Sequence, residues 1–165
     1  IVKFSSEKRY RFRILEAVET VNERQKIRLL ERLDEHFGKR LKGRTVAVWG
    51  LAFKPRTDDM REAPAVPIVE GLLARGAKVR AYDPEAHEVA KRLFKSRITY
   101  ARHAYDALTG ADALVIVTEW NDFREPDFAR MKRLMRQPVI FDGRNLYDPA
   151  QIRERGFEYT SIGRP

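Results

Sequence analysis

A regular alternation of short apolar runs and helical patterns begins at Arg44 and is the feature that most constrains the fold. The apolar runs are nearly continuous, as in strands that helices cover on both faces. We expect strands over residues 45–50, 78–84, 98–101, 111–120, 138–143 and 157–163. Apolar residues at helical spacing predict helices over residues 63–76, 85–95, 103–110 and 127–136. This order of elements predicts an α/β fold, with a doubly wound, mainly parallel, six-stranded Rossmann-like sheet in the strand order 3-2-1-4-5-6.

A long amphipathic segment precedes this alternation. Apolar residues recur at helical spacing from Ile14 to Phe37 and Gly38 follows as a stop signal, which predicts one helix about 37 Å long over residues 14–38. Polar residues at 22–26 interrupt its apolar stripe. Because the helix lies outside the alternating pattern, we favour a connector or dimerisation helix over one that packs on its own domain. The apolar side chains expected to meet a second copy or a neighbouring helix are Val18, Val21, Leu30 and Leu33.

Composition narrows the function. The chain of 165 residues is 43% hydrophobic, which is enough for a packed core, and it contains no cysteine. The lack of cysteine excludes disulfides, thiolate metal ligands and a cysteine nucleophile. His36, His87 and His103 fall on separate predicted helices, so we expect no metal site. No apolar run approaches about 18 residues and no signal-peptide pattern is visible, which favours a cytoplasmic protein without a membrane partner.

The net charge of +9 raises the question of a polyanionic partner. Basic and acidic residues number 12 and 7 over residues 1–43, and 21 and 17 over residues 44–165. Their signs alternate in most windows, as on solvated helix faces, and no zinc-finger or RNA-binding signature accompanies them, so we expect no nucleic-acid partner. The boundary at residue 43 also separates the expected connector or dimerisation region, 1–43, from the expected α/β domain, 44–165.

The segment after the first strand, G-L-A-F-K-P-R-T-D-D-M-R-E at residues 50–62, lies where doubly wound folds bind ligands. It lacks the three glycines of G-x-G-x-x-G, so its backbone cannot cradle a pyrophosphate. It offers cationic side chains instead, and we favour a binding role for Lys54 over a solvated lysine. Asp59, three residues before Glu62, is interpreted as part of a capping box that opens the next helix rather than as a ligand-binding carboxylate.

Other strand ends carry further candidates. Asp83 follows the second strand, like the acid that binds ribose in dinucleotide folds, but its spacing favours a helix N-cap followed by a proline. Glu119 and Trp120 follow the fourth strand, where a sugar or base platform and an aromatic plug are equally consistent with them. Arg144 follows the fifth strand and suits an acidic ligand, with Asp142 placed to hold it.

Four blocks of the chain together resemble one family. They are G-L-A-F-K-P-R-T-D-D-M-R-E-A-P-A, Y-D-P, T-E-W and F-D-G-R-N, and the segment at residues 14–26 is similar to the central helix region of the same family. In this order and spacing they resemble the carboxyl-terminal part of the UDP-glucose 6-dehydrogenase family. The resemblance implies oxidation of a sugar C6 hydroxyl to a carboxylate with two NAD⁺. It also implies an amino-terminal NAD domain, a central helical dimerisation region and a carboxyl-terminal domain for the UDP moiety.

By matching motifs, the resemblance implies that Phe53, Lys54 and Arg144 contact the nucleotide sugar and that Arg61 faces the NAD site. The family's catalytic cysteine and its G-x-G-x-x-G loop have no counterpart in this chain.

The resemblance therefore implies a UDP-sugar-binding fragment that has no catalytic residue, is inactive alone and forms a homodimer through the long helix. NAD would be bound mainly by another domain. UDP-glucose is the expected substrate. The alternatives are a related UDP-N-acetylmannosamine or GDP-mannose dehydrogenase domain, and a non-catalytic nucleotide-binding or dimerisation module.

Overall fold

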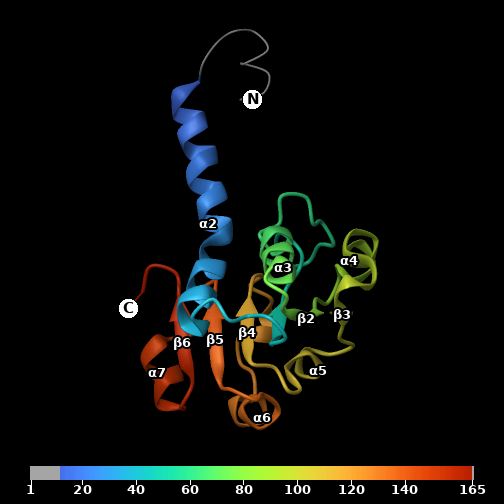
Figure 1. Ribbon diagram of the computed structural model, residues 1–165, viewed down its shortest axis with the longest axis vertical. Coiled ribbons are helices and arrows are strands. Elements are labelled where there is room, and N and C mark those ends of the chain that lie inside the picture. Colours follow the sequence, from blue (N-terminus) through green and yellow to red (C-terminus); the bar gives the residue numbers. More distant parts are fainter. Residues whose placement is uncertain (1–11, 165) are drawn as a thin grey trace.

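The structure is a computed structural model that describes residues 12–164. Six strands form one sheet in the order β3-β2-β1-β4-β5-β6, with helices on both faces (Figure 1). Every neighbouring pair of strands is parallel. The predicted fold class and strand order are therefore confirmed. The strands are β1 (Thr45–Trp49), β2 (Lys78–Tyr82), β3 (Thr99–Tyr100), β4 (Ala113–Ile116), β5 (Val139–Asp142) and β6 (Glu158–Ser161).

The helices include one that the sequence patterns did not predict. It is α7, and the Asp148 side chain caps its N-terminus by accepting a hydrogen bond from the Gln151 backbone N–H at 3.0 Å. The D-P pair that opens it is an N-cap followed by proline, and this signal could have revealed the helix. The helices are α2 (Arg13–Phe37), α3 (Ala65–Ala74), α4 (His87–Phe94), α5 (Ala104–Leu108), α6 (Phe128–Leu134) and α7 (Pro149–Glu154), with 3-10 turns η1 (Lys95–Arg97) and η2 (Asn121–Phe123).

Two hydrophobic clusters fill the two sides of the sheet. Successive side chains of a strand point to opposite faces, so β1 contributes to both clusters. Val46 and Val48 pack with α2, α3 and α4, whereas Ala47 and Trp49 pack with α5, α6 and α7. The central strands β1, β4 and β5 are buried almost throughout, as the near-continuous apolar runs predicted.

The second half of α2 belongs to the core of the domain. Leu33 and Phe37 are buried there, and the helix ends at Gly38 in the left-handed conformation, as the stop signal predicted. At Gly71 of α3 the two helices touch closely, because a Cβ at that position would lie 2.2 Å from Cδ1 of Leu30. The guanidinium of Arg75 clamps the same contact, with Nη2 2.7 Å from Oδ2 of Asp34. The alternative that this helix packs on its own domain is therefore correct for its second half.

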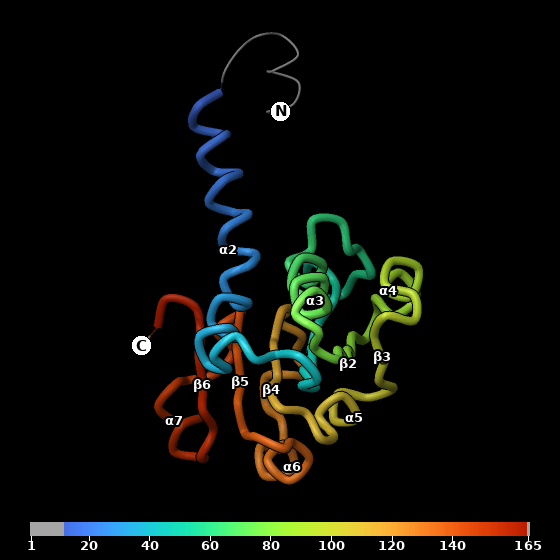
Figure 2. Tube along the Cα trace, in the orientation of Figure 1, coloured from blue at the N-terminus to red at the C-terminus, as the bar shows by residue number. Residues whose placement is uncertain are grey.

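The first half of α2 projects beyond the sheet (Figure 2). Its apolar side chains are exposed there, with Ile14, Val18 and Val21 at 77%, 48% and 57% exposure. The predicted stripe therefore divides into Leu30 and Leu33, which pack in this domain, and Val18 and Val21, which do not. Among residues 12–164 no helix combines the length and the apolar character that crossing a bilayer requires.

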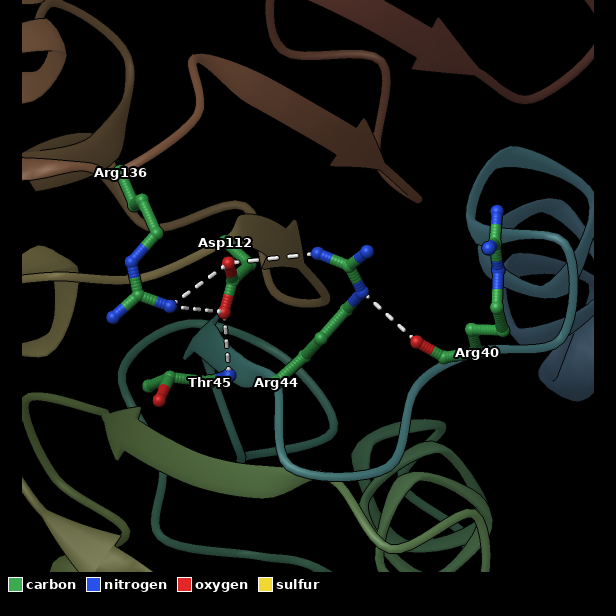
Figure 3. Close-up of polar contacts among 5 residues, drawn as sticks. All are labelled: Arg40, Arg44, Thr45, Asp112 and Arg136. Carbon is green, nitrogen blue, oxygen red and sulfur yellow. Dashed lines mark hydrogen bonds and ion pairs between the residues drawn. The ribbon is translucent and has the colours of Figure 1, made fainter.

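Asp112 ties three elements together at the amino end of the sheet (Figure 3). Its buried carboxylate accepts a hydrogen bond from the Thr45 backbone N–H at 2.8 Å and from Nη1 of Arg136 at 3.1 Å. Nη1 of Arg44 lies 3.6 Å away, and Nε of Arg44 donates to the carbonyl of Arg40 at 2.9 Å. One carboxylate thus joins β1, β4 and the segment before β5, and it also holds the connection from α2.

We predict that Asp112→Ala lowers the free energy of unfolding by about 2 kcal/mol, because it leaves the part-buried Thr45 N–H and two guanidiniums without their acceptor. Arg136→Ala should cost less than about 1 kcal/mol, since that side chain is 63% exposed. Urea denaturation monitored by circular dichroism measures both, with Glu154→Ala on the surface of α7 as the control. If Asp112→Ala and Glu154→Ala lowered the free energy of unfolding equally, the stabilising role assigned to Asp112 would be wrong.

Candidate functional site

The loop at residues 50–62 leaves the sheet between the ends of β1 and β4. Gly50 has a φ of +91°, and a Cβ at this position would lie 2.5 Å from Cβ of Thr118, so only glycine fits. The strand order reverses at β1 and β4, which is where doubly wound sheets bind ligands. Farther along, the Phe53 N–H donates to the carbonyl of Asp59 at 2.8 Å and closes the loop on itself.

The carboxylate of Asp83, at the end of β2, organises this edge of the sheet. It is 1% exposed and accepts five hydrogen bonds. The donors, at 2.7–3.2 Å, are the indole N–H of Trp120 and the backbone N–H groups of Leu51, Ala52, Glu85 and Ala86. A carboxylate engaged in this way has no oxygen left for a ribose. The cap prediction is right that Asp83 binds backbone N–H groups after β2, but α4 itself begins later, with Ala86 as its N-cap.

The predicted capping box at Asp59 is wrong. α3 begins at Ala65, its N-cap is Pro64, and no side chain caps it. The backbone of Glu62 is left-handed, with a φ of 58°, so the chain is not yet helical at the position where the box requires it. Asp59 instead accepts hydrogen bonds from the backbone N–H, Nε and Nη2 of Arg61 at 2.8–3.0 Å, which lower the pKa of Asp59 to about 2.

Trp120 is an aromatic plug, which settles the alternative that the sequence left open. It is 7% exposed, and its indole N–H is committed to Asp83 at 3.2 Å. Its neighbour Glu119 points elsewhere and forms an ion pair with Nε of Arg144. Burial is the largest single influence on the Glu119 carboxyl and opposes its ionisation. The hydrogen bond from Arg144, a backbone hydrogen bond and the charges of Arg144 and Arg124 together outweigh burial and hold the pKa of Glu119 below its usual value.

Asp142 holds the loop that carries Arg144, as predicted. This carboxylate at the end of β5 is fully buried. Its Oδ1 accepts from the Arg144 N–H at 2.8 Å, and its Oδ2 accepts from the Leu146 N–H and the Tyr159 hydroxyl, both at 2.7 Å. Burial and the nearby charge of Asp142 raise the pKa of Tyr159, which keeps its hydroxyl protonated as a donor. The buried carboxylate of Asp142 therefore fixes the backbone around Arg144.

A cleft of about 600 Å³ lies between this loop, the loop after β1 and the middle of α2. Phe53 and Arg144 both line it, although 91 positions separate them in the sequence. Phe53 is 48% exposed. The side chains that α2 adds to the lining are Glu19, Asn22, Glu23, Gln25, Lys26 and Leu29. The sequence patterns did not predict these residues, although four of them, Asn22, Glu23, Gln25 and Lys26, fall in the polar break at 22–26.

A second cleft, of about 1010 Å³, adjoins the first. Arg61 lines it with Arg92 and with apolar side chains that include Met60 and Leu93. The two clefts share Glu23, Lys26 and Glu62. Nζ of Lys26 lies 2.8 Å from Glu23 and 2.7 Å from Glu62, and these two hydrogen bonds raise the pKa of Lys26. An ion-paired lysine therefore stands at the boundary between the two clefts.

Lys54 is exposed on the loop and does not line the cleft that Phe53 and Arg144 share. It has no hydrogen-bond or ion-pair partner within residues 12–164. Its binding role therefore stays a prediction. The structure brings together Phe53 and Arg144, and it places Arg61 on the adjoining cleft.

A doubly wound parallel sheet with an aromatic side chain and a guanidinium in a cleft at its switch point defines an α/β ligand-binding domain. Comparison with known families makes this class specific. Residues 47–149 match a protein-family model, which is described as the UDP-glucose/GDP-mannose dehydrogenase family, UDP binding domain. The chain belongs to this family.

Individual relatives agree with this assignment. The chain is 51% identical over its whole length to a UDP-glucose 6-dehydrogenase of Pseudomonas aeruginosa, of which it covers 38%. Its fold matches the UDP-glucose dehydrogenase of the archaeon Pyrobaculum islandicum with a TM-score of 0.81 and 33% identity, over 96% of this chain and 34% of that one. A UDP-D-ManNAc dehydrogenase from Pyrococcus horikoshii matches with a TM-score of 0.79 and 28% identity, over 97% of this chain and 36% of that one. The chain thus spans little more than a third of the length of these relatives.

We predict that Asp83→Asn lowers the free energy of unfolding by about 2–4 kcal/mol, because an amide NH₂ would face two or more N–H donors in a buried site. Hydrogen exchange at the Leu51 and Ala52 amides should accelerate as their acceptor is weakened. Asp148→Asn is the matched control, since asparagine caps a helix as well as aspartate does. Unchanged exchange at the two amides would refute the role of Asp83.

Proposed function

We propose that this chain is the UDP-sugar-binding part of a dehydrogenase that oxidises UDP-glucose to UDP-glucuronate with two NAD⁺. Membership of the family and the 51% identity to a UDP-glucose 6-dehydrogenase support this proposal. The observation that carries it is the cleft that Phe53 and Arg144 share, because the motif blocks that suggested the family supply both side chains. Oxidation itself requires a nucleophile and a cofactor loop that this chain does not contain.

The proposed roles follow from side-chain chemistry. The exposed ring of Phe53 offers an apolar face for a base or a sugar ring. The guanidinium of Arg144 offers a planar fork to phosphate or carboxylate oxygens, and Lys54 offers a point charge to the diphosphate.

The residues of this chain could contact NAD from one side only and could not enclose it. The loop after β1 has no glycine-rich phosphate cradle. The cleft lined by Arg61 and Arg92 combines guanidiniums with apolar side chains, a mixture suited to one side of a phosphate-bearing ring compound. When bound, NAD⁺ would accept the hydride from the sugar. The Arg61 side chain is 90% exposed, and its proposed role is to contact the cofactor from this domain.

We predict that Lys54→Ala in the full-length protein raises the KM for UDP-glucose roughly tenfold to a hundredfold, the effect of losing about 1.5–3 kcal/mol of charge-assisted contact. Arg61→Ala should raise the KM for NAD⁺ more than that for UDP-glucose. Steady-state NADH production measures both, and Lys78→Ala, at the opposite edge of the sheet, is the matched control. Faster turnover of UDP-N-acetylmannosamine or GDP-mannose than of UDP-glucose would reassign the sugar, and unchanged kinetics for Lys54→Ala would remove that residue from the site.

We also propose that the protein is a homodimer joined through the first half of α2. The exposed Ile14, Val18 and Val21 are apolar surface that a second copy of the helix would cover. Replacing Val18 and Val21 together by glutamate should convert the dimer to a monomer in light scattering, because burying two carboxylates is costly. Glu31→Lys, which alters charge on the same helix without removing apolar surface, should leave the mass unchanged. A wild-type protein that scatters as a monomer would exclude the dimer.

A further inference from the structure

The guanidinium of Arg144 is held in place before any ligand arrives. Its backbone N–H is bound to Asp142 at 2.8 Å. The next residue, Asn145, has a left-handed φ of 56° and anchors the loop to Ile162 by two hydrogen bonds, at 3.0 and 3.1 Å. At the far end of the side chain, Nε is paired with the Glu119 carboxylate. Both the backbone and the head group of the arginine are therefore fixed.

The contact with Glu119 uses Nε only. Within residues 12–164, Nη1 and Nη2 of Arg144 donate no hydrogen bond, so these terminal nitrogens stay available as donors. Arg144 lines the cleft and Glu119 does not, so the cation of this pair, rather than its carboxylate, is the group available to a ligand there. Glu119 follows β4 and Arg144 follows the adjacent strand β5, and their side chains are 32% and 31% exposed, respectively. A half-buried pair of this kind is screened by water less than a surface pair.

We propose that Glu119 is a positioning residue that orients the terminal nitrogens of Arg144 toward the phosphates of a nucleotide in the cleft. This inference rests on the proposed function. A free arginine loses rotamer freedom when it clamps a phosphate, and that loss weakens binding. In this protein the arginine has already lost that rotamer freedom on folding, because Glu119 immobilises its side chain. The contact leaves Nη1 and Nη2 free to donate. Phosphate oxygens can then accept hydrogen bonds from the two terminal nitrogens of the planar guanidinium.

Two substitutions separate this role from simple charge competition. Glu119→Ala removes the orienting acceptor and its charge. Glu119→Gln keeps an oxygen that can accept from Nε and removes only the charge. We expect Glu119→Ala to raise the dissociation constant of UDP about threefold to tenfold, the range for immobilising one flexible side chain. Glu119→Gln should retain most of the wild-type affinity.

The ligands provide the second control. Isothermal titration of the full-length protein with UDP and with uridine isolates the phosphate contribution, since the two ligands differ only in the diphosphate. Glu119→Ala should raise the dissociation constant of UDP and leave that of uridine within about twofold of the wild-type value. Glu154→Ala on α7 should change neither dissociation constant. The melting temperature of each variant checks that the fold persists.

The outcomes discriminate among the possibilities. Tighter UDP binding by Glu119→Ala would mean that the carboxylate competes with the ligand, and an equal loss for UDP and uridine would mean a general structural effect. Unchanged UDP binding would mean that Glu119 does not orient the arginine. Each of these overturns the inference while leaving the proposed function intact. A wild-type protein that does not bind UDP would overturn both.

Discussion

The ligand edge of this domain depends on the buried carboxylate of Asp83. A carboxylate removed from water is costly unless donors surround it, and five N–H groups from the loops after β1, β2 and β4 do so here. These loops are therefore held as one unit rather than as separate flexible segments. Asp142 repeats the arrangement farther along the same edge of the sheet, where β5 and β6 end. Neither acid lines the cleft; the side chains that do are Arg144, whose backbone Asp142 holds, and Phe53, which follows the Leu51 and Ala52 amides that Asp83 holds.

The sequence was sufficient to predict the sheet because its signals are local and repeated. Continuous apolar runs mark buried parallel strands, and short right-handed connections leave few possible strand orders. The same local logic failed at Asp59, where the spacing of a capping box is present but the left-handed backbone of Glu62 delays the helix to Ala65. It could not decide between plug and platform for Trp120, because the deciding partner is Asp83, 37 positions away.

α2 shows why the site was predicted only in part. Apolar periodicity runs along the whole helix, yet one half packs in the core and the other half is exposed, and periodicity alone does not distinguish them. The break at 22–26 looked like a defect in the stripe, but Asn22, Gln25 and Lys26 from that break line the cleft. Polar residues that interrupt an apolar pattern are expected where a helix lines a cleft rather than the core.

The spacing between the two walls of the cleft is set in the core. α2 forms one wall, and the loops after β1 and β5 form the other. The helix is seated by two glycines, since a Cβ at Gly71 would meet Leu30 at 2.2 Å and one at Gly143 would meet Leu29 at 2.8 Å. Close-packed interiors transmit such contacts rigidly. The ion pair of Lys26 with Glu62 then joins helix and loop at the boundary with the second cleft. The position of α2, and with it the width of the first cleft, therefore depends on close packing beneath the helix.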